Sequence, residues 1–331
     1  MEITNKTICV AGASGLVGAN LVKYALENGY HVNGTFRNIE DPEKAPYLKA
    51  LPGADSRLKL FSANMANPGD FDEALQGVDA VFIACLIPTY FGPNGKPARE
   101  MDDEQGHTEI VMPTVDGCLN ILRSAAAAKV KNVLICSSTS STNPIPPVAK
   151  KNEVDHWSDQ KQQYAAKKYT SAAKTVMEPA AMKFAEEHGM RLSIFLPTLM
   201  LGPAVLPEHS RVGFQGALKK MITDGATRHE KIPNDSNSMI HVQDLAKLFF
   251  AAYENPAAQG RYFGVYESWH WQDIYSELAK LIPDLQIPAS LTEAPAEPTG
   301  FDFTRRDSLG VTLRDIPTIL RETVEAVRQE G

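Results

Sequence analysis

Gly12, Gly15 and Gly18 form a loop that could hold the phosphates of a dinucleotide. The loop follows an apolar, strand-like run, Thr7–Ala11, and opens a helical run that begins near Leu16. In this context Gly12 permits a tight turn, Gly15 lets backbone N–H groups approach the pyrophosphate, and Gly18 lets the helix pack closely on the strand. The first N–H groups of the helix then point at the phosphates. The residues predicted to form this cofactor loop are Gly12, Ser14, Gly15, Leu16, Val17 and Gly18.

The residue that follows the second predicted strand decides which dinucleotide fits. Sites that prefer NAD place Asp or Glu there to bond the ribose 2′-hydroxyl. Here Arg37 follows the strand His31–Phe36, and no carboxylate occurs before Glu40. A guanidinium suits a 2′-phosphate because it donates two parallel hydrogen bonds. The sequence therefore predicts NADP(H) rather than NAD, the alternative being that Arg37 is an ordinary exposed arginine.

The composition argues against several other classes of protein. The 331 residues carry a net charge of −7, so the chain lacks the basic surplus of a nucleic-acid binder. No apolar run is long enough to span a bilayer, and residues 1–6 lack the features of a signal peptide, so we expect a cytoplasmic protein without membrane contact. The four cysteines are widely spaced and no His/Cys pattern predicts a metal site, so we expect reduced, buried thiols and no bound metal.

Strand-like and helical runs alternate through the first two-thirds of the chain. The predicted strands are Thr7–Ala11, His31–Phe36, Leu58–Ser62, 79–86, 132–138 and 192–197, and the predicted helices include Leu16–Glu27, 113–129 and 170–188. The run 79–86 is almost continuously apolar, as expected of a parallel strand covered on both faces. This alternation predicts an α/β fold of the Rossmann type with a doubly wound parallel sheet.

Beyond Gly202 the pattern changes, because prolines and glycines interrupt it repeatedly. We therefore predict an NADP-binding Rossmann domain of residues 1–202 plus 239–265. Residues 203–238 and 266–331 should form a smaller C-terminal substrate lobe. This lobe should cover the carboxyl ends of the strands, where ligands bind in open α/β sheets.

Two apolar features could shape a substrate pocket. The long segment 86–109 contains aromatic residues and could form a lid. In the smaller lobe, Phe214, Leu218 and Met221 recur at helical spacing and are either core residues or one wall of the cleft. If they face the cleft, the pocket suits an aromatic or medium-chain ketone or aldehyde.

Eight short motifs, in this order, resemble the extended short-chain dehydrogenases/reductases of the NAD-dependent epimerase/dehydratase superfamily. They are 11–18 (AGASGLVG), 34–37 (GTFR), 71–77 (FDEALQG), 113–119 (PTVDGCL), 132–138 (NVLICSS), 197–202 (PTLMLG), 241–245 (HVQDL) and 319–324 (ILRETV). The chain is most similar to the branch of the dihydroflavonol reductases and cinnamoyl-CoA reductases. The resemblance implies an NADP-dependent oxidoreductase that acts on carbonyl groups of small molecules, in a superfamily where two copies often pair as a homodimer.

The resemblance also assigns roles along the cofactor. Asn64 and Met65 correspond to residues near adenine, with Asn in place of the family's Asp. Ala84 corresponds to the residue beside the cofactor at the end of the fourth strand. The residues that correspond to the nicotinamide-lining segment are Pro197, Thr198 and Leu199.

Members of this family reduce a carbonyl group with a Ser or Thr, a Tyr, and a Lys four residues after the Tyr. The lysine ammonium lowers the pKa of the tyrosine, which then gives a proton to the forming alkoxide. Ser138 corresponds to the family serine, with Ser137 as the alternative one residue earlier. Lys174 corresponds to the lysine, which also contacts the cofactor.

The tyrosine does not match its expected position, and three explanations are open. Thr170 lies four residues before Lys174, whereas Tyr169 lies five before it and would point about 140° away on a regular helix. Tyr169 could still reach the site from before the helix or from a bulge. Tyr164 and Lys168 have the four-residue spacing but lack the flanking match. Otherwise the chain has no tyrosine acid, and Thr170 could hold only a hydrogen bond.

These features predict NADPH-dependent, reversible reduction of a small hydrophobic ketone or aldehyde, with Ser138, Tyr169 and Lys174 as the catalytic residues. A nucleotide-sugar epimerase or dehydratase with bound NAD is an alternative on the same fold, and Arg37 argues against it. A regulatory protein that binds NADP without chemistry is a second alternative, which the displaced tyrosine supports.

Overall fold

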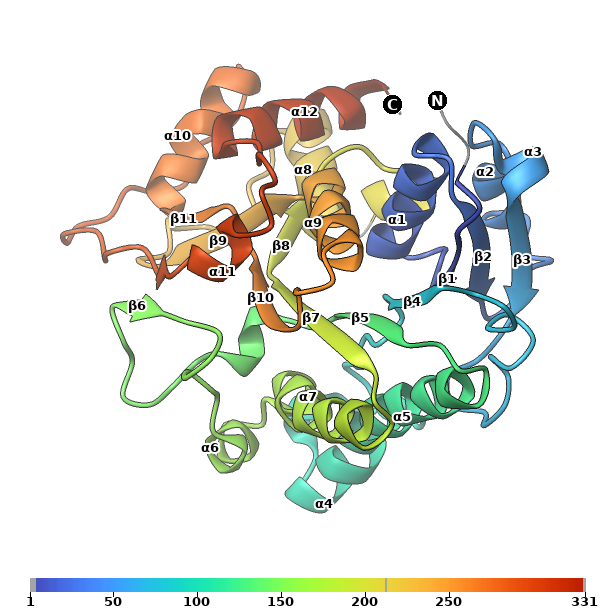
Figure 1. The fold of residues 1–331 in the computed structure, drawn as a ribbon. Helices are drawn as coiled ribbons and strands as arrows, with labels where there is room; N and C mark the ends of the chain where they lie inside the picture. Colours follow the sequence, from blue (N-terminus) through green and yellow to red (C-terminus); the bar gives the residue numbers. More distant parts are fainter. Residues whose placement is uncertain (1–3, 212, 330–331) are drawn as a thin grey trace.

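A seven-stranded parallel sheet forms the centre of the molecule (Figure 1). The computed structural model describes residues 4–211 and 213–329. The strands are β1 (Thr7–Ala11), β2 (His31–Phe36), β3 (Leu58–Ser62), β4 (Ala80–Ile83), β5 (Asn132–Cys136), β7 (Arg191–Pro197) and β10 (Gly260–Gly264), in the order β10-β7-β5-β4-β1-β2-β3. The chain builds outward from β1 to β3 and then returns to place β4 on the other side of β1. This is the doubly wound Rossmann-type sheet that the sequence predicts.

Helices cover both faces of this sheet (Figure 1). The helices on one face are α1 (Leu16–Glu27) and α9 (Val242–Glu254), and those on the other face are α5 (Met112–Ala127) and α7 (Tyr169–Glu187). Side chains alternate along β1, so Ile8 and Val10 join the core beneath α1 and α9. Cys9 and Ala11 join the opposite core, beneath α5 and α7. Both faces of the strand are therefore buried, which explains its continuous apolar sequence.

A smaller lobe near the C-terminus has a core of its own. Its main elements are β8 (Leu199–Leu201), β9 (Ser236–His241), β11 (Glu267–His270), α8 (Gly213–Asp224), α10 (Trp271–Leu281) and α12 (Ile316–Gln329), with the sheet order β11-β9-β8. Phe214, Leu218 and Met221 are buried in this core together with Trp271, so they are core residues and not a wall of the cleft. β8 lies within residues 1–202 but pairs with β9. The domain boundaries given above stay a prediction.

The remaining elements are short. They are the helices α2 (Ala45–Lys49), α3 (Ala54–Arg57), α4 (Asp103–Gly106), α6 (Gln160–Ala165) and α11 (Thr304–Asp307), the 3₁₀ turns Ala98–Glu100, Thr139–Ser141 and Pro207–Ser210, and the strand pair β6 (Lys150–Lys151) and β12 (Gly300–Phe301). A π-helical turn, His107–Val111, joins α4 to α5. Across the described ranges, no helix combines the length and apolar character that crossing a membrane requires.

The segment 86–109 begins with a small hairpin and continues into helical turns. Phe91 pairs with Pro97 across the hairpin, and the Ala98 N–H donates to the Tyr90 carbonyl at 2.8 Å. Tyr90 and Phe91 leave 68% and 56% of their surface exposed, so the hairpin presents apolar surface to solvent. Its role as a lid stays a prediction.

Candidate functional site

A cleft of about 780 Å³ lies at the carboxyl ends of β1, β2 and β4. The predicted cofactor residues that line it are Gly12, Ser14, Gly15, Arg37, Asn64, Met65 and Ala84. Leu16, Val17 and Gly18 follow Gly15 in the first turn of α1, where backbone N–H groups have no acceptor within the helix. The structure therefore brings seven of the fourteen predicted cofactor residues, from separate parts of the sequence, to one cavity.

Two glycines of the loop are required by close contacts. Gly12 has φ +89°, and a Cβ atom there would lie 2.8 Å from the Cβ atom of Cys85. A Cβ atom at Gly18 would lie 2.0 Å from the Gly12 carbonyl oxygen, well inside van der Waals contact. Gly15 is the N-cap of α1 and has no side chain to cap the helix, so the helix N-terminus faces the cleft without a competing group.

Two cations line the cleft beyond the end of β2. Arg37 is exposed there and lines the cleft, and its contact with a 2′-phosphate stays a prediction. Lys44 lines the same cleft, with its Nζ atom 3.3 Å from Asp41 and 3.6 Å from Glu208. Lys44 was not predicted, although a second basic residue in the loop after the second strand was a usable signal. This end of the cleft therefore holds two cations together with the two carboxylates, Asp41 and Glu208, that pair with Lys44.

Lys174 lies at the carboxyl ends of β4 and β5. Its ammonium donates hydrogen bonds to the carbonyl groups of Leu86 and Cys136, the latter at 3.4 Å. Cys85 and Ile87, which flank Leu86, line the cleft. Burial lowers the pKa of Lys174 from its ordinary value. The structure thus places this lysine directly behind the wall of the cleft.

The two candidate serines have different environments. Ser137 is buried, and its hydroxyl donates to the carboxylate of Glu178. Ser138 is half-buried and begins the 3₁₀ turn, with its Oγ atom accepting from the Ser140 N–H at 3.1 Å. Because an Oγ atom that accepts can still donate its own proton, Ser138 is the serine that is free to bond a ligand.

The contacts of Tyr169 argue against the prediction that it joins Lys174. Tyr169 is the first residue of α7, which is a regular α-helix from that point. Because Lys174 lies five residues later, the two side chains lie on different faces of the helix. Its side chain is fully buried, and its hydroxyl donates to Asp103 at 2.7 Å and accepts from Lys167 at 3.0 Å. Burial raises the pKa of Tyr169, which is opposite to what a neutral-pH acid needs.

Tyr164 does not replace it. α6 ends at Ala165, so Tyr164 and Lys168 do not share a helix face. The Tyr164 hydroxyl lies 2.7 Å from the His107 Nδ1 atom, and its ring stands edge-on to Tyr169. The structure therefore favours the third explanation, in which Thr170 stands where the family has its tyrosine.

A second cavity of about 630 Å³ lies beside the first turn of α7. Its apolar lining comes mainly from Pro144, Ile145, Pro147, Val148 and Ala149, and its polar lining includes Asn143, Ser158, Gln163, Lys168 and Ser171. Ser158 donates to the Ser140 carbonyl at 2.7 Å, so the cavity adjoins the turn that Ser138 begins. This cavity was not predicted, because its walls come from loops without a regular pattern.

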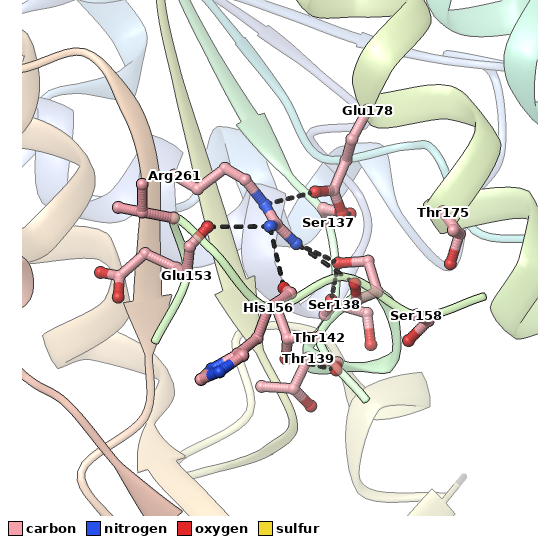
Figure 2. A network of polar contacts seen from close by, with 12 residues as sticks. Ser137, Ser138, Thr139, Thr142, Glu153, His156, Ser158, Thr175, Glu178 and Arg261 are labelled. Atoms are coloured by element: carbon pink, nitrogen blue, oxygen red, sulfur yellow. Dashed lines mark hydrogen bonds and ion pairs between the residues drawn. The ribbon is translucent and has the colours of Figure 1, made fainter. Parts of the chain in front are cut away.

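A buried ion pair underlies the serine turn (Figure 2). Glu178 and Arg261 approach within 2.8 Å, and Arg261 also donates to the Ser141 hydroxyl at 2.9 Å. Neither residue was predicted, because a single charged residue on an apolar helix face or in an apolar strand forms no recognisable sequence pattern. Pro197, Thr198 and Leu199 lie where β7 ends and β8 begins, and their role beside the nicotinamide stays a prediction.

Comparisons with known proteins agree with the fold. A sequence model of the NAD dependent epimerase/dehydratase family matches residues 8–265. Cinnamoyl-CoA reductase 1 of Arabidopsis thaliana is 31% identical over 331 residues, covering 98% of this chain and 90% of the relative. Dihydroflavonol 4-reductase of Callistephus chinensis is 28% identical over 340 residues, covering 100% of this chain and 88% of the relative. The crystal structure of vestitone reductase from alfalfa (Medicago sativa) has a TM-score of 0.80 at 24% identity, covering 98% of this chain and 99% of that one.

Proposed function

The chain belongs to the NAD dependent epimerase/dehydratase family, and we propose that it reduces a small hydrophobic ketone or aldehyde with NADPH, reversibly. Two of its relatives are named as reductases of different compounds, one acting on a cinnamoyl-CoA and one on a dihydroflavonol. These names support the class of reaction. They do not determine the substrate of this chain, which has to be inferred from its own residues.

The observation that carries the proposal is the cleft itself, which joins a glycine loop to two cations. The N–H groups at the start of α1 suit a pyrophosphate, and Arg37 and Lys44 suit a 2′-phosphate. Asn64 and Met65 would contact the adenine. When bound, NADPH supplies the hydride, and Lys174 and Ser138 lie at the strand ends where the reacting carbon would sit.

The residues near Lys174 can bind and polarise a carbonyl group. In the proposal, the hydroxyl groups of Ser138 and Thr170 donate hydrogen bonds to the carbonyl oxygen. The positive charge of Lys174 stabilises the negative charge that develops there. Because an alcohol is a poor acid at neutral pH, the proton of the product comes from solvent water.

The apolar part of the substrate is assigned to the second cavity. Its volume of about 630 Å³ accommodates an aromatic or medium-chain group, and Ile145 offers apolar surface at its wall. Its position next to Ser171, three residues before Lys174, supports this assignment.

Turnover assays test the proposed reaction. The purified protein should oxidise NADPH in the presence of aromatic or medium-chain aldehydes and ketones, with slower use of NADH. Ile145→Asp, which places a charge in the second cavity, should raise KM for the carbonyl compound and leave KM for NADPH unchanged. Equal rates with both cofactors would contradict the role of Arg37 and Lys44.

A regulatory protein that binds NADP without chemistry is the second candidate. The observation that favours it is the absence of a tyrosine from the Lys174 face of α7, where Thr170 stands instead. NADPH binding together with no turnover across a broad carbonyl panel would support this candidate over the reductase.

A further inference from the structure

Glu178 is a fully buried acid one helical turn after Lys174 on α7 (Figure 2). One carboxylate oxygen lies 2.8 Å from the Arg261 Nε atom, and the other accepts a hydrogen bond from the Ser137 hydroxyl. Two consecutive turns of α7 therefore contact the end of β5, because Lys174 bonds the Cys136 carbonyl and Glu178 bonds the next residue.

Arg261 has several partners besides Glu178. Its side chain is almost fully buried, and its guanidinium donates to the Ser141 hydroxyl at 2.9 Å and to the Glu153 carbonyl at 2.8 Å. The guanidinium also stacks on Trp157, at 3.5 Å from the ring centroid. A buried charge with fixed partners requires its counter-charge, so the carboxylate is held beside the serine turn.

The groups that face Lys174 differ in charge. They are Cys85 after β4, Cys118 on α5, Cys136 on β5 and Glu178 on α7. Burial raises the pKa of Cys85 and Cys118 to about 12 and that of Cys136 to about 11, so all three thiols are neutral at neutral pH. Burial raises the pKa of Glu178 as well, while the positive charge of Arg261, 2.8 Å away, lowers it. Because it pairs with this guanidinium, Glu178 is the candidate anion among the described groups that face this lysine.

We infer that Glu178 is a positioning residue that keeps Lys174 protonated and, through Arg261, fixes the turn that begins at Ser138. The inference rests on the proposed function for its consequence in turnover. The link between Glu178 and Lys174 rests on their four-residue spacing on α7 and on their bonds to the consecutive residues Cys136 and Ser137. Burial lowers the pKa of Lys174 and the negative charge of Glu178 opposes that change. Removing the charge therefore shifts the loss of the lysine proton to lower pH.

The test is Glu178→Gln, which keeps the shape of the side chain and removes its charge. The ε-¹³C NMR signal of Lys174, assigned by its loss in Lys174→Arg, should titrate about one pH unit lower than in the wild type. The alkaline limb of kcat should move by the same amount, with KM for NADPH changed less than about twofold. Glu186→Gln, an exposed site on the same helix, is the matched control and should leave both titrations unchanged.

Two further measurements separate charge from shape. Glu178→Asp keeps the charge, so Lys174 in this variant should titrate within a few tenths of a pH unit of its wild-type value. An equal shift of the Lys174 titration in the Asp and Gln variants would overturn the inference. Should Glu178→Gln fail to fold, the wild-type carboxyl ¹³C signal of Glu178 decides, since an ionised group at neutral pH is required and a protonated one excludes the counter-ion role. A wild-type protein without turnover would contradict the proposed reduction. The NMR titrations would still test the link between Glu178 and Lys174.

Discussion

Thr170 occupies the position on α7, four residues before Lys174, where a tyrosine acid would share its helix face. Thr170→Tyr therefore places a phenol beside a lysine ammonium, which lowers the phenol pKa and makes it a better proton donor. We expect kcat for carbonyl reduction to rise at least about tenfold, within the range that general acid catalysis provides. Thr170→Phe, which adds the ring without the hydroxyl, is the control and should show no gain in steady-state assays.

Tyr169 is a structural residue by its contacts. Tyr169→Phe removes the hydrogen bond to Asp103 and leaves the ring in its buried place. We expect the free energy of unfolding to fall by about 1 kcal/mol in urea titrations, with kcat within about twofold of the wild type. A hundredfold loss of kcat in a variant that is still folded would contradict this and restore Tyr169 as the proton donor.

Arg37 and Lys44 should select NADPH over NADH. Arg37→Ala and Lys44→Ala each remove a cation from the same end of the cleft. Each should raise KM for NADPH about tenfold, equivalent to about 1.4 kcal/mol of binding, and leave KM for NADH nearly constant. Lys49→Ala, an exposed neighbour on α2, should change neither value. A parallel rise in both KM values would mean that these cations do not read the 2′-phosphate.

The cofactor side of the site was predictable from the sequence, whereas the donor side was not. Gly12 and Arg37 are placed in the cleft by local backbone and strand-end geometry, which short motifs predict well, and their roles toward the dinucleotide stay predictions. The fate of Tyr169 depends on Asp103, 66 positions away, and such a contact leaves no local pattern. The ion pair between Glu178 and Arg261 was not predicted for the same reason, since the two residues are far apart in the sequence.

Among the elements, the buried strands and their flanking helices were predicted best. β1, β2, β3 and α1 have the predicted bounds, and the apolar pattern is clearest in β1 and α1. β4 ends at Ile83, earlier than the apolar run 79–86 suggests, since the chain leaves the sheet there to form the wall of the cleft. The edge strand β10 was missed because it is short and contains Arg261, whose buried charge breaks the apolar pattern.

The junction of β1 and α1 should tolerate alanine at Gly15 but not at Gly18. Gly18→Ala places a Cβ atom 2.0 Å from the Gly12 carbonyl oxygen, so the helix must move away from the strand. We expect a loss of about 1–3 kcal/mol in urea denaturation and of NADPH binding with it. Gly15→Ala meets that oxygen at 3.5 Å, an ordinary contact, and should unfold like the wild type. Equal stability of the two variants would contradict the close packing described here.

At the scale of the whole molecule, the turn Pro207–Ser210 and the glycine loop, far apart in the sequence, contribute to the same cleft. The His209 Nε2 atom lies 2.9 Å from the Ser14 carbonyl oxygen, and Glu208 lines the cleft near Lys44. Residues from the turn before α8 thus close over the glycine loop of the first strand. The sequence predicted two lobes around a cleft, but the composition of the lobes could not reveal which of their loops meet.

Calorimetric titration of the purified protein with NADPH, and then with NADH, tests the central claim most directly. The claim is that the glycine loop, Arg37 and Lys44 together hold one NADPH molecule. We expect one site per chain, with NADPH bound at least about tenfold more tightly than NADH. The absence of any binding heat with NADPH across a range of temperatures, or equal affinity for the two dinucleotides, would contradict the claim.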